Sequence, residues 1–326
     1  MPVTWSDDID EVIGGDLTAA LSCRTPAGGA VVTAVAPIGL RDREAGWVGF
    51  TTSLGFGKKL THMARDPRVS LAYHDRTYGM ASSDLYVLVQ GRAEIIAEPD
   101  EALIATMLAN GQRFLGPLKR GRLFWDRWLR EYYQIRVPVK VHVERVVAWP
   151  DLRWTGAPEV TGPARAEGPP PAQSAPRKGA GPRVDSARAA RRCARLANRL
   201  LAYVDADGWP VSAPVRLEGA GAGGIRLAAS PGAIPPGTRR AGFLAHSYRP
   251  HLIGLTTRYL TGWLTPDGAA PTTALYAPHT EAGFAAPPNK TLLLLVNGGF
   301  AKMGVRTALK QGTLERADGQ LRAVGS

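Results

Sequence analysis

The sequence predicts a mainly β protein made of two similar small barrels with peripheral helices. Three observations predict this fold class. Short runs rich in β-branched and aromatic residues alternate with Gly, Pro and Asp breaks, the order of these runs recurs in the second half, and a Pro-, Ala- and Gly-rich stretch separates the two series. The 326 residues suffice for about two domains of roughly 150 residues each. We expect a first barrel over 1–155, a linker over 156–185 and a second barrel over 186–326.

The first half has the clearer strand pattern. Its expected strands are 17–24, 30–36, 47–53, 69–73, 86–97 and 137–149. In the last of them valines alternate with polar residues, which is typical of a strand with one buried face. About six strands joined by short turns predict a small closed barrel.

Helices are expected between and after these strands. A short helix opens at Lys58 and ends before Pro67, because a proline disfavours helical conformation at the residue before it. Further helical regions are expected at 99–134, at 186–202 with Ser186 as N-cap, and at 300–310. Aromatic residues at near-helical spacing within 99–134 are interpreted as packing against the barrel: Phe124, Trp125, Trp128, Tyr132 and Tyr133.

The second half repeats the order of the first. LSCRTPAGGAVVTAVAPI resembles LAYVDADGWPVSAPVRL, and GWVGFTTS resembles GGIRLAAS. The matched pairs and their offsets are Leu21 and Leu201 (180), Ser53 and Ser230 (177), Leu71 and Phe243 (172), and Gly91 and Gly262 (171). A constant order with small deletions indicates a duplication, the alternative being a chance likeness of Gly-punctuated strands.

The largest deletion removes the short helix from the second copy. Ser53 and Leu71 are 18 positions apart, whereas Ser230 and Phe243 are 13 apart. The second copy has two adjacent prolines in this stretch and no lysine, and proline is excluded from helix interiors. Only the first copy therefore keeps the lysine-bearing turn and helix.

The positive charge is concentrated in one segment. The net charge is +12, and residues 163–199 contain nine Arg or Lys against two acidic residues. No sequence signature of a nucleic-acid-binding fold accompanies this segment, so it is interpreted as a solvated surface. Binding of nucleic acid through this segment remains the outside alternative.

Other features bound the location and the chemistry. Cys23 and Cys193 are far apart and form no disulfide framework, which favours a reducing, cytoplasmic setting. The acidic N-terminal stretch MPVTWSDDIDEVIGG does not resemble a signal peptide, and LLLLV is too short to span a bilayer, so no membrane partner is expected. The six histidines form no H-E-x-x-H motif and no Cys/His cluster, so no protein-built metal site is expected.

The stretch TTSLGFGKKLTHMARDP predicts an anion site. Its candidate ligands are hydroxyls followed by two adjacent lysines: Thr51, Thr52, Ser53, Lys58 and Lys59. Gly55 and Gly57 allow the tight turn between the two groups. Cations in a first helical turn oppose the helix dipole unless an anion is bound there. The alternative is an ordinary solvated helix start.

The same stretch resembles a known family. GFTTSLGFGKKLTHMARDPRVSLAY is similar to the phosphate-binding segment of the FMN-binding split barrels, which are the pyridoxamine-phosphate-oxidase-like flavoproteins and their deazaflavin-dependent actinobacterial relatives. The matching positions are Phe50, Thr52, Lys58, Lys59, Asp66, Pro67, Arg68 and Leu71. The resemblance covers about residues 15–150 and is weaker over 200–275. It implies two split barrels in tandem, the second degenerate, whose halves pair as a pseudo-dimer; a homodimer stays open.

The resemblance also implies a cofactor site. Thr52, Lys58 and Lys59 would bind the phosphate, and the strand containing Val32, Thr33, Ala34 and Val35 would run along the ring system. Trp263 is the first candidate for an aromatic wall from the second half, with Tyr259 and His246 as others, although each suits an ordinary core as well. FMN is the implied cofactor, with the deazaflavin coenzyme, whose acidic tail could meet the basic segment, and heme as alternatives.

The implied activity is hydride transfer between the bound cofactor and a small organic substrate. Such chemistry needs no acid–base pair from the protein, which positions the cofactor and excludes water, and no catalytic residue is assigned. In the oxidase branch of the family, a lysine at the end of the second strand and an Arg-x-His near the C-terminus serve the phosphate-bearing substrate. Here the strand ends AVAPI and no Arg-x-His follows in the matching place, which argues against pyridoxamine phosphate as substrate. The alternative function is a carrier or sensor that binds flavin, deazaflavin or heme without turnover.

Overall fold

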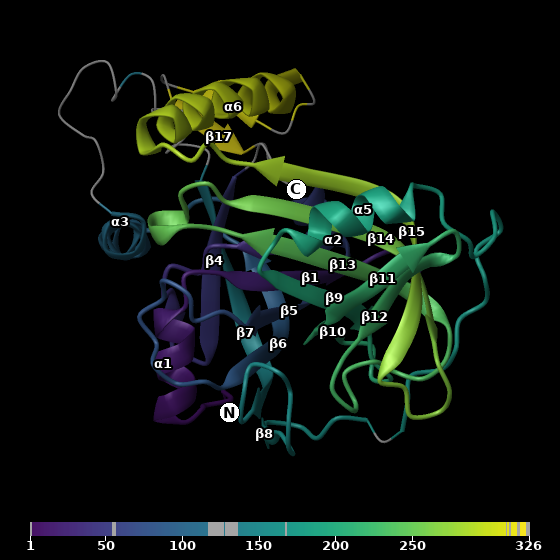
Figure 1. Ribbon diagram of the computed structural model, residues 1–326. Helices are drawn as coiled ribbons and strands as arrows, with labels where there is room; N and C mark the ends of the chain where they lie inside the picture. Colours follow the sequence, from purple (N-terminus) through teal and green to yellow (C-terminus); the bar gives the residue numbers. More distant parts are fainter. Residues whose placement is uncertain are drawn as a thin grey trace.

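The computed structural model contains two extensive β-sheets with helices at their edges (Figure 1). It describes residues 2–53, 57–116, 127, 136–166, 168–310, 312, 314–317 and 320–323. The first half contains α1 (Asp7–Gly15), β1 (Ala19–Arg24), β2 (Ala30–Val35), β3 (Arg41–Asp42), β4 (Trp47–Ser53), α2 (Gly57–Arg65), β5 (Arg68–Tyr73), β6 (Tyr86–Ile95), α3 (Glu101–Leu115), β7 (Arg136–Trp149) and β8 (Glu159–Thr161). The second half contains α5 (Ser186–Ala194), β9 (Asn198–Val204), β10 (Pro210–Pro214), β11 (Arg216–Gly221), β12 (Gly224–Ala228), β13 (Arg239–Ser247), η2 (Pro250–Leu252), β14 (Thr256–Pro266), β15 (Thr273–Ala285), α6 (Lys290–Lys310), β16 (Leu314–Ala317) and β17 (Gln320–Ala323).

The two sheets have the same topology. The first runs β2-β1-β5-β6-β7-β4-β3 and the second runs β10-β9-β13-β14-β15-β12-β11, strand for strand in the same order. In the first sheet Thr51 N donates to Ala36 O at 3.4 Å, which joins the ends of β2 and β4 and curls the sheet toward closure. The equivalent pair in the second sheet, Arg216 and Ala228, is also in register. The predicted fold class of two tandem barrels is confirmed.

Strand registers agree with the alignment of the two copies. Leu21 lies opposite Leu71, and at the equivalent place Leu201 lies opposite Phe243. Each sheet has a bulge at the same position, beginning at Gly91 in β6 and at Gly262 in β14. A Cβ on either glycine would overlap a carbonyl oxygen of the neighbouring strand, so both copies need glycine at the bulge. A shared irregularity of this kind supports duplication over chance likeness.

The two copies differ where the deletion was found. The first has α2 after β4, and the second has a helix-free turn over 231–237 before β13. Proline in that turn explains the absence of a helix from this described segment, as the sequence predicts.

Several predicted helix boundaries were wrong. The helix expected over 186–202 ends at Ala194, and β9 begins at Asn198, because Leu200 and Leu201 are buried between neighbouring strands. Tertiary pairing here overrides the helical propensity of Leu and Arg. The N-cap is Asp185, whose carboxylate accepts from Arg188 N at 2.9 Å, and not Ser186.

The remaining helices also differ in extent from the prediction. The last helix, α6, begins at Lys290, ten residues before the expected 300, and the β16–β17 hairpin after it was not predicted. Within 99–134 the described helix is α3. The aromatic set expected there (Phe124, Trp125, Trp128, Tyr132 and Tyr133) lies outside the described residues, as does Gly55.

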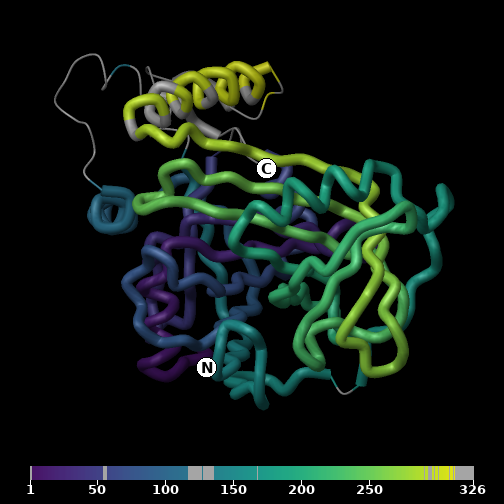
Figure 2. The backbone as a smooth tube through the Cα atoms, in the orientation of Figure 1, coloured from purple at the N-terminus to yellow at the C-terminus, as the bar shows by residue number. Residues whose placement is uncertain are grey.

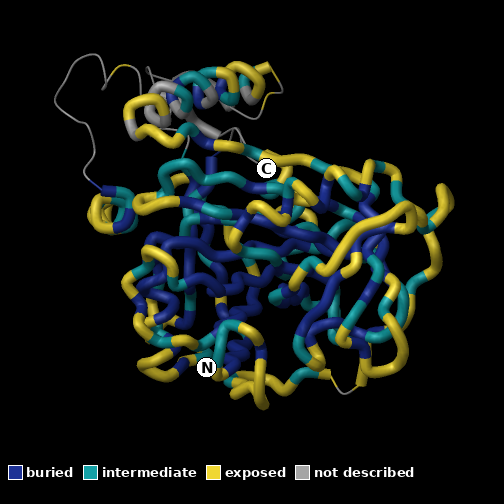
Figure 3. The backbone as a smooth tube through the Cα atoms, in the orientation of Figure 1, coloured by how far each residue is buried: buried dark blue, intermediate teal, exposed yellow. Residues whose placement is uncertain are grey.

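The halves pack on each other through their edge strands β2 and β10. Tyr86 of β6 donates its hydroxyl to Ser212 O at 2.7 Å, and Gln90 donates its side-chain amide to Pro210 O at 2.9 Å. The hydroxyls of Ser22 and Ser212 lie 2.6 Å apart. One buried apolar cluster contains residues of both halves, and Figure 3 shows the buried backbone continuing across the junction.

A histidine pair marks an approximate two-fold axis between the halves. His74 directly follows β5 of the first copy, and His246 lies at the equivalent place in the second, since His74 and His246 are 172 positions apart, as are Leu71 and Phe243. Their Nε2 atoms lie 2.7 Å apart and both side chains are buried. A residue that contacts its own equivalent must lie on the symmetry axis. The two halves are therefore arranged like the subunits of a symmetric dimer.

The segment between the copies is irregular but makes specific contacts. Figure 2 shows it running along the outside of the molecule between β8 and α5. Gln173 donates its side-chain amide to Gly28 O at 2.8 Å, and its amide oxygen accepts from Arg240 N at 3.0 Å. One linker side chain thus ties both halves together. No helix in the described part of the chain is long and apolar enough to cross a bilayer.

Candidate functional site

The end of β4 holds a buried hydroxyl without a hydrogen-bond partner. Thr52 lies opposite Val137 of β7 and is 2% exposed, on the same side of β4 as the core residues Val48 and Phe50. Among the described residues, nothing within hydrogen-bonding distance pairs with its Oγ1. A buried polar atom left unpaired is unfavourable by about 1–3 kcal/mol, so a ligand acceptor at this place would stabilise it.

The start of α2 brings positive charge to the same end of the barrel. Lys58 and Lys59 lie in its first turn, which has no acidic residue, and α2 contacts β1 and β6. The pKa of Lys59 is lowered to about 8. Burial is the main cause, the Cys23 thiol opposes it, and the positive charge of Arg136 adds to it. Burial disfavours the charged ammonium, and an anion bound at this place would stabilise it.

Arg136 is a site residue that sequence reasoning missed. It is the first residue of β7 and lies opposite Ser53 at the end of β4. Nothing local distinguishes it from other strand arginines, because its place follows from the pairing of two strands more than 80 residues apart. Asp66, which is the acidic residue nearest to Lys58 and Lys59 along the chain, is ion-paired with Arg24 and Arg68, at 3.1 and 3.0 Å.

The strand predicted to follow the ring reaches the same place. Val32 and Ala34 of β2 face the second half, whereas Val35 joins the core of the first barrel. Near its start, β2 is in close contact with β13, because a Cβ on Gly242 would overlap Ala30 O. Thr33 and Ala34, further along, are half-buried, and the strand then joins β4 through the Ala36–Thr51 hydrogen bond. The end of β2 is thus the part open to a ligand.

The aromatic wall is less well supported by the geometry. Trp263 lies in β14, is 3% exposed and has the Arg240 guanidinium 5.6 Å from its ring centroid. His246 is buried against His74, and Tyr259 is exposed. β14 does pack on β2, but no contact recorded among the described residues joins these three side chains to Thr52 or the lysines. The role of Trp263 stays a prediction.

The described residues were also considered as metal ligands and as reactive thiols. No group of three His, Cys, Asp or Glu side chains among them could hold a metal ion. Both cysteines are buried and unpaired with each other, and burial raises the pKa of each thiol to about 12.

Neither a protein-family model nor a curated protein matches the sequence. Several solved structures do match. The chain is similar to pyridoxamine 5'-phosphate oxidase-like proteins. A putative pyridoxamine 5'-phosphate oxidase from Listeria innocua is 14% identical, with a TM-score of 0.28, over 44% of this chain and 95% of that one.

Two other solved structures also match a little under half of this chain. A conserved hypothetical protein of Mycobacterium tuberculosis, Rv2991, is 26% identical over 48% of this chain and 91% of its own, with a TM-score of 0.35. A protein named F420 reductase is 20% identical over 42% of this chain and 94% of its own, with a TM-score of 0.31. The matched structures thus include proteins named as a pyridoxamine 5'-phosphate oxidase and as an F420 reductase.

Proposed function

We propose that the chain is an oxidoreductase that binds FMN, or alternatively the deazaflavin coenzyme, at the end of β4 and the start of α2. One observation carries the proposal. An unpartnered buried hydroxyl, that of Thr52, lies at the same barrel end as Lys59, whose pKa is depressed, and Arg136. This donor set fits a phosphate, which accepts hydrogen bonds and carries nearly two negative charges.

Each residue has a defined role in this proposal. Lys58, Lys59 and Arg136 neutralise the phosphate, and Thr52 donates its hydroxyl hydrogen to a phosphate oxygen. Phosphate bound at the start of α2 also interacts favourably with the helix dipole and with free backbone N–H groups.

The edge strand β2 supplies the second part of the site. Among the described strands it pairs with β1 alone, so alternate N–H and C=O groups point away from the sheet. Near Thr33 and Ala34 these groups can bind the polar edge of a planar ring, while the second half covers the site from water. A bound flavin would supply hydride transfer, and the chain positions it and excludes solvent.

The test is cofactor binding by a double variant with a matched control. Lys58→Ala with Lys59→Ala should weaken FMN binding at least about 100-fold, the weight of two charge-assisted hydrogen bonds. Arg177→Ala with Lys178→Ala removes the same two charges from exposed positions of the linker and should leave the dissociation constant for FMN unchanged. Calorimetric titration with FMN and with the deazaflavin coenzyme, in parallel, chooses between the two cofactors. Equal binding by the double variant and the control would reject the site.

Turnover is tested separately on the loaded protein. If the bound flavin is reduced by a nicotinamide donor and reoxidised by an added acceptor, the protein is an oxidoreductase. Tight binding without reduction by any donor would instead favour the carrier or sensor function.

A further inference from the structure

The second half has a cavity at the place equivalent to the candidate phosphate site. Its volume is about 450 Å³, and its walls include Arg153, Val215, Arg216, Ala228, Ala229 and Ser230. The strand registers make Ala228, Ala229 and Ser230 the counterparts of Thr51, Thr52 and Ser53. By the same alignment Val215 and Arg216 correspond to Val35 and Ala36. A cavity of this volume is large enough for a small organic molecule.

The chemistry of this cavity differs from that of its counterpart. Methyl groups of Ala228 and Ala229 stand where the first half has threonine hydroxyls, and the lysine-bearing helix is replaced by the turn at 231–237. The hydroxyl of Ser230 donates to Arg153 O at 2.6 Å. The walls are thus mainly apolar, and the cationic groups are the guanidinium groups of Arg153 and Arg216, both exposed at the rim.

Arg153 is held in place by a firmly built loop of the first half. The Asp151 carboxylate accepts hydrogen bonds from the backbone N–H groups of Arg153 and Thr155, at 2.9 and 3.0 Å. The next residue, Trp154, is buried and stacks on Trp149 with ring centroids 3.7 Å apart. The cavity is therefore formed by both halves, and the backbone of one of its two arginines is held at the rim.

The counterpart of this loop in the first site has no arginine at the position of Arg153. Continuing the alignment of β7 with β15 places Pro287 and Pro288 at the positions of Leu152 and Arg153. The two sites therefore carry their positive charge on different elements. The first has it on α2 and β7 of its own barrel, and the second receives it partly from the other half.

We propose that this cavity is a second ligand site, separate from the cofactor site, for a small organic anion with an apolar body. Guanidinium groups bind carboxylates and phosphates through paired N–H donors, and the alanine and valine walls suit a flat or branched hydrocarbon part. Without the helix start and the hydroxyls, the cavity lacks the groups that would bind a second cofactor phosphate in the manner of the first half.

The experiment uses 4-fluorobenzoate and 4-fluorophenyl phosphate as probes, followed by fluorine NMR on the full chain. We expect saturable binding of at least one probe with a dissociation constant below about 1 mM. The double change Arg153→Ala with Arg216→Ala should weaken it tenfold or more, and Ala229→Trp should weaken it similarly by filling the cavity. Circular dichroism and the melting temperature check that each variant is folded.

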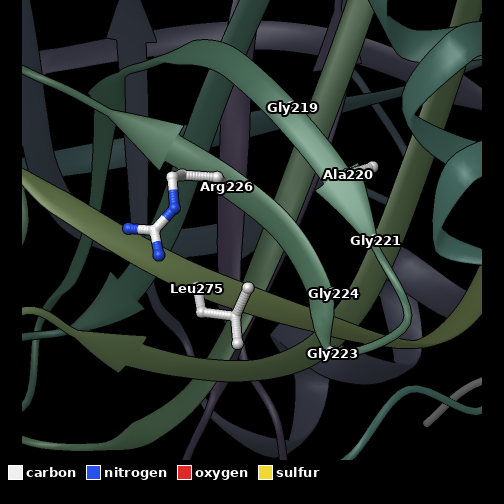
Figure 4. Close-up of a pocket in the computed structure, with 7 residues that line it drawn as sticks. All are labelled: Gly219, Ala220, Gly221, Gly223, Gly224, Arg226 and Leu275. Carbon is white, nitrogen blue, oxygen red and sulfur yellow. The ribbon is translucent and has the colours of Figure 1, made fainter.

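Two controls distinguish this site from other basic positions. Arg226→Ala should leave probe binding unchanged. Arg226 lies on β12, as Ala228 does, but it lines a separate hollow of about 230 Å³ beside Leu275 and the glycine-rich β11–β12 hairpin (Figure 4). Its guanidinium is paired with Asp267 at 2.7 Å. Lys58→Ala with Lys59→Ala should also leave it unchanged, even if that variant loses FMN.

Each contrary result has a definite meaning. Absence of saturable binding by both probes, or equal losses in the Arg226→Ala control, would overturn the proposal. Loss of probe binding in the lysine double variant would place the probe in the first site and would also overturn it. Uptake of two FMN molecules per chain, with the second abolished by Arg153→Ala, would reject the assignment to a different ligand.

Discussion

Raising the pH from 7 to 9 is expected to weaken binding of FMN about tenfold, because Lys59 loses its proton in this range. The pKa of Lys59 in the ligand-free protein is about 8, lowered mainly by burial. With that value, roughly nine-tenths of the molecules carry protonated Lys59 at pH 7 and roughly one-tenth at pH 9. If only the protonated form binds the phosphate well, the affinity falls by about the ratio of these fractions, which is about tenfold or about 1.4 kcal/mol.

The sign follows from linkage. Bound phosphate stabilises the charged ammonium, so the pKa of Lys59 is higher in the complex than in the free protein, and above pH 8 binding must take up a proton. The ligand does not change its own charge in this window, since the second phosphate ionisation has a pKa of about 6.

Fluorescence titration of FMN at several pH values measures this effect, and riboflavin is the matched ligand without a phosphate. Riboflavin binding should not vary between pH 7 and 9. The variant Lys59→Met should bind FMN weakly at both pH values, with a flat profile. An equal pH dependence for riboflavin and FMN, or an unchanged dependence in Lys59→Met, would refute the assignment of this proton to Lys59.

Three further predictions concern stability and binding. Thr52→Val should raise the free energy of unfolding of the ligand-free protein by up to about 1 kcal/mol in thermal melts, since it removes an unpaired hydroxyl, yet weaken FMN binding about tenfold by titration. Burial lowers the pKa of His74, and burial together with His74 lowers that of His246 to about 3, so folding disfavours the protonated form of both. Because the unfolded chain takes up these protons below about pH 6.5, the free energy of unfolding should decrease as the pH is lowered, by up to about 1.4 kcal/mol per pH unit per histidine. The double change His74→Phe with His246→Leu should flatten this pH profile in calorimetry. Gly91→Ala should destabilise by about 1–3 kcal/mol in urea unfolding because its Cβ would overlap a backbone carbonyl, whereas Gly219→Ala, with open space around it, should not.

The extent to which the sequence predicts this structure depends on how local each feature is. Strands and turns follow from short-range sequence patterns. The repeat offsets match Leu21 with Leu201, and the strand registers place these two residues at equivalent positions. The helix expected to run to 202 failed because burial of Leu201 between strands outweighs its helical propensity. Arg136 could not be predicted as a site residue, since only the pairing of β4 with β7 brings it beside Ser53.

The histidine pair shows a similar limit. The offset of 172 makes His74 and His246 equivalent positions, and this is visible in the sequence. That they touch is decided by how the halves pack, because contact between equivalents needs the symmetry axis to pass between them. No pattern within either copy predicts the position of that axis.

Fusion of the two barrels into one chain explains how the two sites can differ while the axis stays symmetric. In a homodimer, every substitution appears in both grooves, so a helix lost from one is lost from both. In a tandem chain the two grooves change separately, and here Thr52 with its lysine helix stands opposite Ala229 with a proline turn. A residue on the axis is less free to change, because it contacts its own counterpart and a substitution in one must remain compatible with the other. The identical histidines at the centre and the dissimilar grooves on either side are what this constraint leads us to expect, and the cavity beside Ala229 is where a function absent from the first groove could arise.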